Sequence, residues 1–344
     1  MPIGLGDEEA AAYAAGAAPA SFVDMLGTAS YRCVAAAQRL GVFGALADGP
    51  LTAPALAAAI GADPRGVGLL ADALDGFGYL TRTDDGYATT PAAAKWLASS
   101  DGYAVVELFW QRVLFELWDG LEESVRTGKP AVDFYAWLAE RPETSRHFQT
   151  MLDGHATHLA AEVGDLVPVS EGSVLDLGGG HGRYSIALCQ RHPGLTATVL
   201  DFPGALDASA VEEAGLADRI TLRAGDYTRE PLGTGHDLVL LFNVLHGHTE
   251  ANNRALLARV AAALRPGGTV AVLENSTDVP AEEGRAGVAF LHTFSLNLFH
   301  GQGGQVYPAS RIAGWLTDAG LHEPTVTRLR ESPGQHLVLA TMPS

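Results

Sequence analysis

Residues 173–192, SVLDLGGGHGRYSIALCQRH, decide the fold of the larger part of this chain. A short apolar segment that contains Asp176 runs into glycines at 178, 179, 180 and 182, and an amphipathic segment follows. This order is typical of a strand, a tight loop and a helix in an α/β unit, with the loop at the carboxyl end of the strand. Because such a loop serves dinucleotides as well as other nucleotide-like ligands, it predicts the fold class and leaves the ligand open.

The segments downstream repeat this alternation. Further strands are predicted at LTATVLDF (195–202), ITLRAGDY (220–227), HDLVLLFNVLH (236–246) and GGTVAVLEN (267–275), and the helix ALLARVAAALRPGG (255–268) precedes the last of them. Strands rich in Val, Leu and Ile with helical crossovers indicate a mostly parallel sheet covered on both faces. The carboxyl ends of its strands should form one crevice, lined by Asp176, the loop 178–182, Asp201, Asp226 and His246.

Carboxylates at successive strand ends favour an adenosine ligand. Asp201 lies 19 residues after Gly182, the position of an acid that accepts hydrogen bonds from ribose hydroxyls. Asp226 can meet an adenine amino group, and the ring of Tyr227 can lie against the base. Arg183 is the one basic residue beside the loop, so nothing here is built to neutralise a pyrophosphate. S-adenosylmethionine therefore suits the site better than NAD.

The first third of the chain predicts a winged-helix module. Residues 20–97 contain short helices broken by Gly and Pro, followed by YLTRTDDGYATT (79–90), in which Asp85-Gly86 is a hairpin signal. The candidate recognition helix TAPALAAAI (52–60) carries no Lys or Arg, and the wing carries Asp84 and Asp85. These features argue against DNA binding and for a structural, dimer-forming role.

The middle of the chain is helical and rich in aromatic residues. Phe148, Met151, Leu152 and His155 follow helical spacing and predict either core packing or the wall of a substrate pocket. We therefore predict three parts: 1–102 as the dimerisation domain, 103–168 as pocket helices, and 169–344 as the principal domain. The candidate substrate-pocket residues are Phe109, Phe148, Met151, His155 and Asn297.

Composition excludes several classes of partner. The 344 residues include 22 basic and 40 acidic ones, and the formal charge of −18 repels both nucleic acid and anionic lipid. Cys33 and Cys189 have no CxxC partner, which argues against a disulfide framework or a thiolate metal site. There is no run of about 18 apolar residues, and the first residues lack the basic charge of a signal peptide. We expect a soluble cytoplasmic protein that acts on a small molecule.

The motifs VLDLGGGHG, LDFP, AGDY, LRPGG and VLE, with LH after the fourth strand, resemble a known family. They look like the class I S-adenosylmethionine-dependent methyltransferases of the caffeic acid and hydroxyindole O-methyltransferase type. The resemblance covers nearly the whole chain. It implies an α/β Rossmann-like methyltransferase domain, an N-terminal helical winged-helix dimerisation domain, the cofactor S-adenosyl-L-methionine and a homodimer.

The resemblance also implies roles for single residues. His246 matches the family's general base, and Glu274 matches a carboxylate that orients it. Two positions depart from the family, because a cofactor-contacting lysine falls on Phe242 and a second orienting glutamate falls on Val306. The predicted cofactor-binding residues are Asp176, Gly178, Gly180, Asp201, Phe202, Asp226, Tyr227 and Asn243.

Several histidines suggest a metal instead of a plain base. The run His246-Gly247-His248-Thr249 replaces the usual His-Asp-Trp, and His292 and His300 lie eight residues apart in a predicted helix. Imidazoles converging with Glu274 would favour a divalent or ferric ion with nitrogen and oxygen ligands. The set resembles that of the metal-dependent 2-oxo acid C-methyltransferases of the same superfamily.

Our leading hypothesis is therefore C-methylation at the β-carbon of a 2-oxo acid through a metal-bound enolate. His246, His292 and His300 would be the ligands, His248 a reserve ligand, and Glu274 would orient a ligand or take the β-proton. Two alternatives stay open. One is metal-free O-methylation of a phenolic or polyketide hydroxyl with His246 as base. The other is a non-catalytic adenosine-ligand binder that uses its winged helix on DNA.

Overall fold

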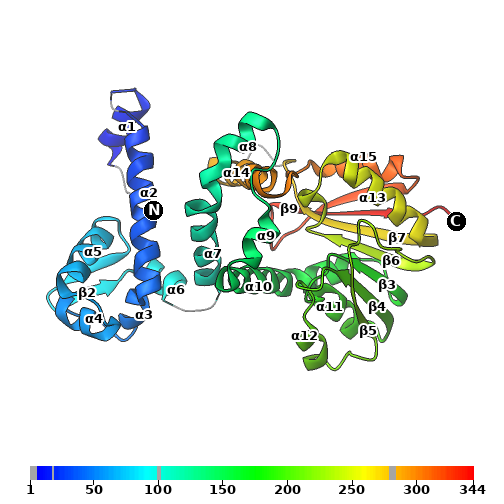
Figure 1. Ribbon diagram of the computed structural model, residues 1–344, viewed down its shortest axis with the longest axis horizontal. Helices are drawn as coiled ribbons and strands as arrows, with labels where there is room; N and C mark the ends of the chain where they lie inside the picture. Colours follow the sequence, from blue (N-terminus) through cyan, green and yellow to red (C-terminus); the bar gives the residue numbers. More distant parts are fainter. Residues whose placement is uncertain (1–5, 18, 99–101, 279–283) are drawn as a thin grey trace. The chain divides into compact units, whose positions relative to one another are not determined.

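The computed structural model describes residues 6–17, 19–98, 102–278 and 284–344. The chain forms two compact units (Figure 1), which are described separately. Unit 1 comprises Met1–Leu114 and Arg146–Met151, and unit 2 comprises Phe115–Ser145 and Leu152–Ser344. The domain boundaries predicted after residues 102 and 168 stay a prediction.

Unit 1 is built from short helices and one hairpin. Side-chain caps start three of its helices, because Thr52 Oγ1 accepts from the amide of Ala55, Asp63 Oδ1 from the amide of Gly66 and Thr90 Oγ1 from the amide of Ala93. The elements are α1 (Asp7–Ala14), α2 (Ser21–Leu40), α3 (Val42–Ala45), α4 (Ala53–Ile60), α5 (Pro64–Gly76), β1 (Leu80–Thr83), β2 (Gly86–Thr89), α6 (Pro91–Leu97) and α7 (Tyr103–Phe115), whose last residue belongs to unit 2.

The predicted hairpin is present, with a shifted turn. β1 and β2 pair antiparallel with Thr83 opposite Gly86, so the two turn residues are Asp84 and Asp85. The turn therefore lies one residue before the Asp85-Gly86 pair that the sequence suggested, and Gly86 begins the second strand with φ +127°. A Cβ at Gly86 would lie 2.3 Å from the carbonyl group of Leu51, so glycine is needed here for close backbone approach.

Unit 2 contains a seven-stranded sheet in the order β5-β4-β3-β6-β7-β9-β8. The five strands predicted from the sequence are all present and pair parallel to one another. The last two strands were not predicted, and they pair antiparallel at the β7 side. The strands are β3 (Glu171–Leu177), β4 (Gly194–Asp201), β5 (Ile220–Ala224), β6 (His236–Phe242), β7 (Leu264–Asn275), β8 (His322–Arg328) and β9 (Gln335–Thr341).

Helices cover both faces of this sheet (Figure 1). Leu257 and Trp315, on α13 and α15, pack into the core of one face, and Leu159 and Leu188, on α10 and α11, pack into the core of the other. The strand order reverses at β3, which lies between β4 and β6, and ligands of such sheets bind at the carboxyl ends of the strands next to this point. The helices are η1 (Leu117–Gly120), α8 (Leu121–Thr127), α9 (Phe134–Ala139), α10 (Pro142–Leu166), α11 (Arg183–Arg191), α12 (Ala208–Glu213), η2 (Leu245–Gly247), α13 (Glu250–Ala263), α14 (Arg285–Gln302) and α15 (Ala309–Asp318).

Two simpler expectations concern membranes and cysteines. Among the described residues, no helix combines the length and apolar character that crossing a membrane requires. Cys33 and Cys189 are both free thiols.

Candidate active site

The glycine loop after β3 approaches its neighbours too closely for side chains. Gly178 has φ +71°, and a Cβ there would lie 2.7 Å from Cγ2 of Val244. A Cβ at Gly179 would lie 2.5 Å from the carboxylate of Asp176. Gly182 then starts α11. The loop therefore keeps its backbone exposed to the crevice, as a site for a closely approaching ligand requires.

Asp201 ends β4 beneath this loop. Its Oδ2 accepts from the amide of Gly180 at 2.9 Å, and its Oδ1 accepts from the amide of Phe202 at 2.7 Å. The residue is 7% exposed, and burial raises its pKa despite these two hydrogen bonds. Each carboxylate oxygen can accept a further hydrogen bond. Asp201 can therefore accept hydrogen bonds from the loop and from a pair of ligand hydroxyls at the same time.

Asp176 supports the loop from the protein interior. Its Oδ2 accepts from Ser185 Oγ on α11 at 2.7 Å, and the residue is 2% exposed. Burial raises the pKa of Asp176 to about 7, with a further contribution from the charge of Asp201. This carboxyl group links strand and helix.

Aromatic rings lie beside Asp201 at the end of β5. The rings of Phe202 and Tyr227 have centroids 6.1 Å apart, and Phe202 is 41% exposed. Asp226 accepts from the amide and hydroxyl of Thr228, at 2.9 and 2.6 Å. Tyr227 Oη lies 3.1 Å from His248 Nε2. The four predicted cofactor residues Asp201, Phe202, Asp226 and Tyr227 thus lie along one edge of the sheet.

Arg183, the basic residue beside the loop, is engaged by an acid. Its Nη2 donates to Asp153 Oδ2 at 3.1 Å, and its Nε also bonds this carboxylate. The guanidinium charge is therefore compensated inside unit 2. This pairing agrees with the sequence argument that the loop is not built for a pyrophosphate.

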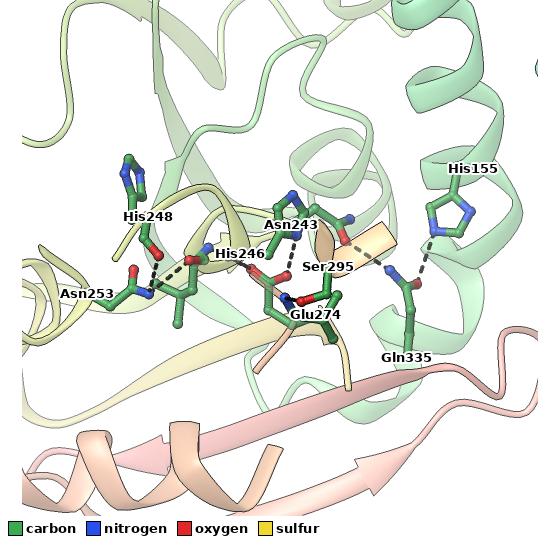
Figure 2. Close-up of polar contacts among 10 residues, drawn as sticks. His155, Asn243, His246, His248, Asn253, Glu274, Ser295 and Gln335 are labelled. Atoms are coloured by element: carbon green, nitrogen blue, oxygen red, sulfur yellow. Dashed lines mark hydrogen bonds and ion pairs between the residues drawn. The ribbon is translucent and has the colours of Figure 1, made fainter. Parts of the chain in front are cut away.

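His246 and Glu274 form a buried pair at the ends of β6 and β7 (Figure 2). His246 Nδ1 lies 2.6 Å from Glu274 Oε2. Glu274 Oε1 accepts from the amide of Leu245 at 2.6 Å and from the amide of His246 at 3.3 Å. A carboxylate can only accept here, so Nδ1 carries a proton and Nε2 of the neutral ring has the free lone pair. Glu274 is 3% exposed, whereas the His246 side chain is 14% exposed.

Three residues that were not predicted from the sequence hold the turn of His246. Asn253 Nδ2 donates to the carbonyl of Leu245 at 2.8 Å, and Tyr307 Oη donates to the carbonyl of His248 at 2.7 Å. The turn also packs against Gly304, where no side chain would fit. A Cβ at Gly304 would lie 1.9 Å from the carbonyl oxygen of His246. No sequence signal separated Asn253 from an ordinary helix residue. The Gly-Gly pair at 303–304 was visible, although its function was not.

Asn243 lies at the start of the same turn. It has φ +58°, a left-handed conformation that few non-glycine residues adopt. Its Oδ1 accepts from Gln335 Nε2 at 2.9 Å, and Gln335 Oε1 lies 3.0 Å from His155 Nε2 (Figure 2). Gln335 was not among the predicted residues, because it lies on a strand that the sequence did not reveal.

The two positions at which the sequence departs from the family pattern are both buried. Phe242 is 7% exposed, and its ring packs edge-on against Tyr184 at 4.7 Å. Val306 is 2% exposed, and its amide donates to Ser295 Oγ at 3.1 Å. Within the described residues, Glu274 is the acid that bonds the His246 ring.

The part of the chain that the structure describes does not bring the predicted histidine ligands together as a metal site. His300 is fully buried, with Nδ1 2.7 Å from Ser124 Oγ and Nε2 2.8 Å from the carbonyl oxygen of Leu117, so both ring nitrogens already have partners. His292 is exposed, and His248 bonds Tyr227. No group of three or more His, Cys, Asp or Glu in the described ranges could hold a metal ion. The prediction was wrong because helical spacing of eight residues does not fix where each ring points.

The predicted substrate-pocket residues divide between the two units. In unit 1, the rings of Phe109 and Phe148 lie 5.2 Å apart, with Met151 in the same helical segment as Phe148. In unit 2, His155 bonds Gln335, and Asn297 Oδ1 accepts from Trp118 Nε1 at 2.9 Å. The pocket itself stays a prediction.

We predict that Gly304→Ala breaks the geometry of the pair. The added methyl group would overlap the His246 carbonyl and must displace the turn. The low-field proton NMR signal of the His246 Nδ1–H bond should shift or broaden in this variant. Gly314→Ala, on α15 with nothing within 4 Å of the new Cβ, is the control and should keep the signal. An unchanged signal in Gly304→Ala would show that the turn adapts without moving the ring.

Comparison with known proteins identifies the family. A family model described as an O-methyltransferase domain matches residues 118–322, and a model described as an O-methyltransferase dimerisation domain matches residues 25–99. The chain is 33% identical over 313 residues to 3-hydroxy-5-methyl-1-naphthoate 3-O-methyltransferase of Streptomyces sahachiroi, covering 89% of each chain.

Two further relatives extend the comparison. L-tyrosine C(3)-methyltransferase of Streptomyces lavendulae is 30% identical, with 90% of this chain and 88% of that one covered. The solved structure of the mitomycin 7-O-methyltransferase MmcR is 27% identical, with a TM-score of 0.82 and coverage of 96% and 99%. The glycine loop, the acids at the strand ends and the His–Glu pair thus occur in a chain that belongs to the O-methyltransferase family of class I S-adenosylmethionine-dependent methyltransferases.

Proposed function

We propose that this enzyme methylates a hydroxyl group of a phenolic or polyketide acceptor, with His246 as the general base. The observation that carries the proposal is the 2.6 Å contact between His246 Nδ1 and the buried carboxylate of Glu274. This proposal replaces the metal-assisted C-methylation that the histidines suggested, since His300 and His248 have other partners. Family membership alone does not decide the acceptor atom, because one relative is named as a C-methyltransferase.

The crevice has donors and acceptors that suit S-adenosyl-L-methionine. Asp201 would accept from the ribose hydroxyls, the loop at Gly178 and Gly180 would admit the ligand closely, and Asp226 with Tyr227 would meet the adenine. Phe202 and Asn243 border the same strand ends. When bound, the cofactor supplies an electrophilic methyl group on a positively charged sulfur. A site in which Asp201 can accept further hydrogen bonds and Arg183 is neutralised by Asp153 fits such a ligand.

His246 acts on the acceptor through its second nitrogen. Glu274 holds the Nδ1–H, so Nε2 is available to take the proton of an acceptor hydroxyl as its oxygen attacks the methyl carbon. The imidazolium that results is stabilised by the Glu274 carboxylate. The chain's contribution is thus a base of fixed tautomer, held by a buried acid.

The surroundings of His246 support an aromatic acceptor. The ring of Phe294 on α14 lies edge-on to His246, with centroids 5.7 Å apart. Phe290 stacks on Phe294 at 6.0 Å with an interplanar angle of 3°, and it is 54% exposed. Flat apolar surfaces beside the base favour a planar ring. The relative named for a hydroxynaphthoate supports the same acceptor class.

We also infer a homodimer from unit 1. Phe22, Met25 and Leu40 lie on α2 and are 45%, 56% and 44% exposed, so this helix presents apolar side chains to its surroundings. The matched dimerisation model covers residues 25–99. A second copy that covers these side chains would remove their apolar area from water.

The first test removes the base. His246→Ala should lower kcat for a phenolic probe such as 3-hydroxy-2-naphthoate by on the order of 10²- to 10⁴-fold. The affinity for S-adenosylhomocysteine, measured by calorimetry, should change little. His292→Ala, which removes an exposed histidine on α14, is the matched control and should behave like the wild type.

A second variant and a chelator separate the alternatives. Glu274→Gln should lose activity comparably, because an amide that donates to Nδ1 forces the proton onto Nε2. Exhaustive chelation should leave phenol methylation unchanged. Chelator-sensitive methylation of 4-methyl-2-oxopentanoate or phenylpyruvate, without turnover of phenols, would overturn the proposal in favour of the metal-assisted reaction.

The second test concerns the cofactor and pH. Asp201→Asn should weaken S-adenosylmethionine binding roughly 10- to 100-fold, since hydrogen bonds to a charged acceptor are lost. Burial raises the pKa of Asp201, so the wild-type affinity should fall as the pH falls through this raised value and the carboxylate is protonated. The variant should depend on pH less steeply, whereas the exposed control Asp218→Asn should follow the wild type. Equal pH dependence in wild type and Asp201→Asn would contradict the assignment.

The third test measures mass in solution. Light scattering after gel filtration should give twice the chain mass of 35.9 kDa. The double variant Phe22→Asp, Met25→Asp should dissociate, because burying two carboxylates at an apolar contact is unfavourable. Thr28→Asp, at an exposed polar position of α2, should stay dimeric. A wild-type mass of one chain at micromolar concentration would refute the dimer.

A further inference from the structure

We propose that Gln335 is a positioning residue that holds the His246 turn by fixing Asn243. The inference rests on the proposed function, since it concerns the same base. Gln335 is fully buried at the start of β9, and its side chain lies between Asn243 and His155 (Figure 2). Its Nε2 donates to Asn243 Oδ1 at 2.9 Å, and its Oε1 lies 3.0 Å from His155 Nε2.

The direction of these two hydrogen bonds is fixed. Because the amide of Gln335 donates through Nε2, its carbonyl oxygen faces His155 and can only accept. His155 therefore carries a proton on Nε2. Burial lowers the pKa of His155, so the ring stays neutral at neutral pH and keeps this tautomer. His155 therefore donates to Gln335, and Gln335 donates to Asn243, so each hydrogen bond in this series has one direction.

Asn243 is the residue that needs such support. Its φ of +58° makes the chain turn between β6 and η2, and its amide donates to the carbonyl of Leu273 at 2.8 Å. Two and three residues later, the amides of Leu245 and His246 donate to Glu274. The turn is therefore held at its start through Gln335 and at its end by Glu274.

The sheet couples these two supports. Across β7 and β9, Gln335 lies opposite Asn275, and His336 lies opposite Glu274. Glu274 and Asn275 are adjacent on β7, so Gln335 lies beside the strand end that carries Glu274. If Gln335 is lost, Asn243 is free to relax from positive φ, and this relaxation would move Val244, the neighbour of Gly178. We expect the base to lose its orientation.

The test first removes the side-chain amide of Gln335 and then replaces Asn243, the residue whose conformation that amide supports. Gln335→Met keeps the length of the side chain without its polar atoms, and it should lower kcat about tenfold at saturating cofactor. The low-field NMR signal of the His246 Nδ1 proton should shift or broaden in the ligand-free variant. Adding Asn243→Gly should restore the signal in the ligand-free protein, because glycine adopts positive φ freely and leaves no unpaired side-chain oxygen. Gln190→Met, at an exposed position of α11, is the control.

The outcomes separate positioning from general destabilisation. If Gln335 only contributes packing, Asn243→Gly will deepen the defect of Gln335→Met and lower its melting temperature further, and the proposal fails. It also fails if Gln335→Met keeps both the wild-type kcat and the signal. Should the wild type methylate no phenol, the proposed function would fail, whereas the NMR signal of the ligand-free protein would still decide the role of Gln335.

Discussion

The buried carboxylate of Glu274 is the interaction on which the active site depends. Taking an ionised carboxylate out of water costs several kcal/mol unless hydrogen bonds replace its hydration. Here three donors do so: the amides of Leu245 and His246 and the His246 ring. Since two of these donors belong to the backbone, the acid fixes the path of the chain as well as the orientation of the ring. The same hydrogen bonds to Glu274 therefore set the orientation of the base and the local fold of the chain.

The carboxylates on the cofactor side of the site are stabilised differently from Glu274. Two of its acids, Asp176 and Asp201, are buried: burial raises the pKa of Asp201, and that of Asp176 reaches about 7, whereas Asp226 pairs with Arg229. The nearby cation, Arg183, is held by Asp153. A ligand that brings hydroxyl donors and a positive charge relieves this arrangement, whereas a pyrophosphate would worsen it. The electrostatics thus select among ligands that the glycine loop alone would admit.

Much of this could be predicted from the sequence, for reasons that differ by residue. The parallel strands were visible because buried strands are continuous apolar runs, and the His246–Glu274 pair was found through the family resemblance. β8 was missed because HEPTVTR gives little apolar signal. β9, QHLVLAT, does contain an apolar run, but its first residue Gln335 is polar and was not recognised. The prediction of a metal site was wrong because the spacing of histidines along a helix does not show which other groups their rings contact. Both ring nitrogens of His300 are hydrogen-bonded, one to Ser124 and one to Leu117. The acceptor pocket stays a prediction.

The place of β9 in the sheet has a consequence for synthesis. β9 is made after β8, yet it lies between β7 and β8. A chain emerging from the ribosome can therefore complete the five parallel strands while the edge of β7 remains unpaired for some sixty residues more. Unpaired edges invite association with other chains. The growing chain, rather than the finished enzyme, is thus the form in which the edge of β7 is open to other chains.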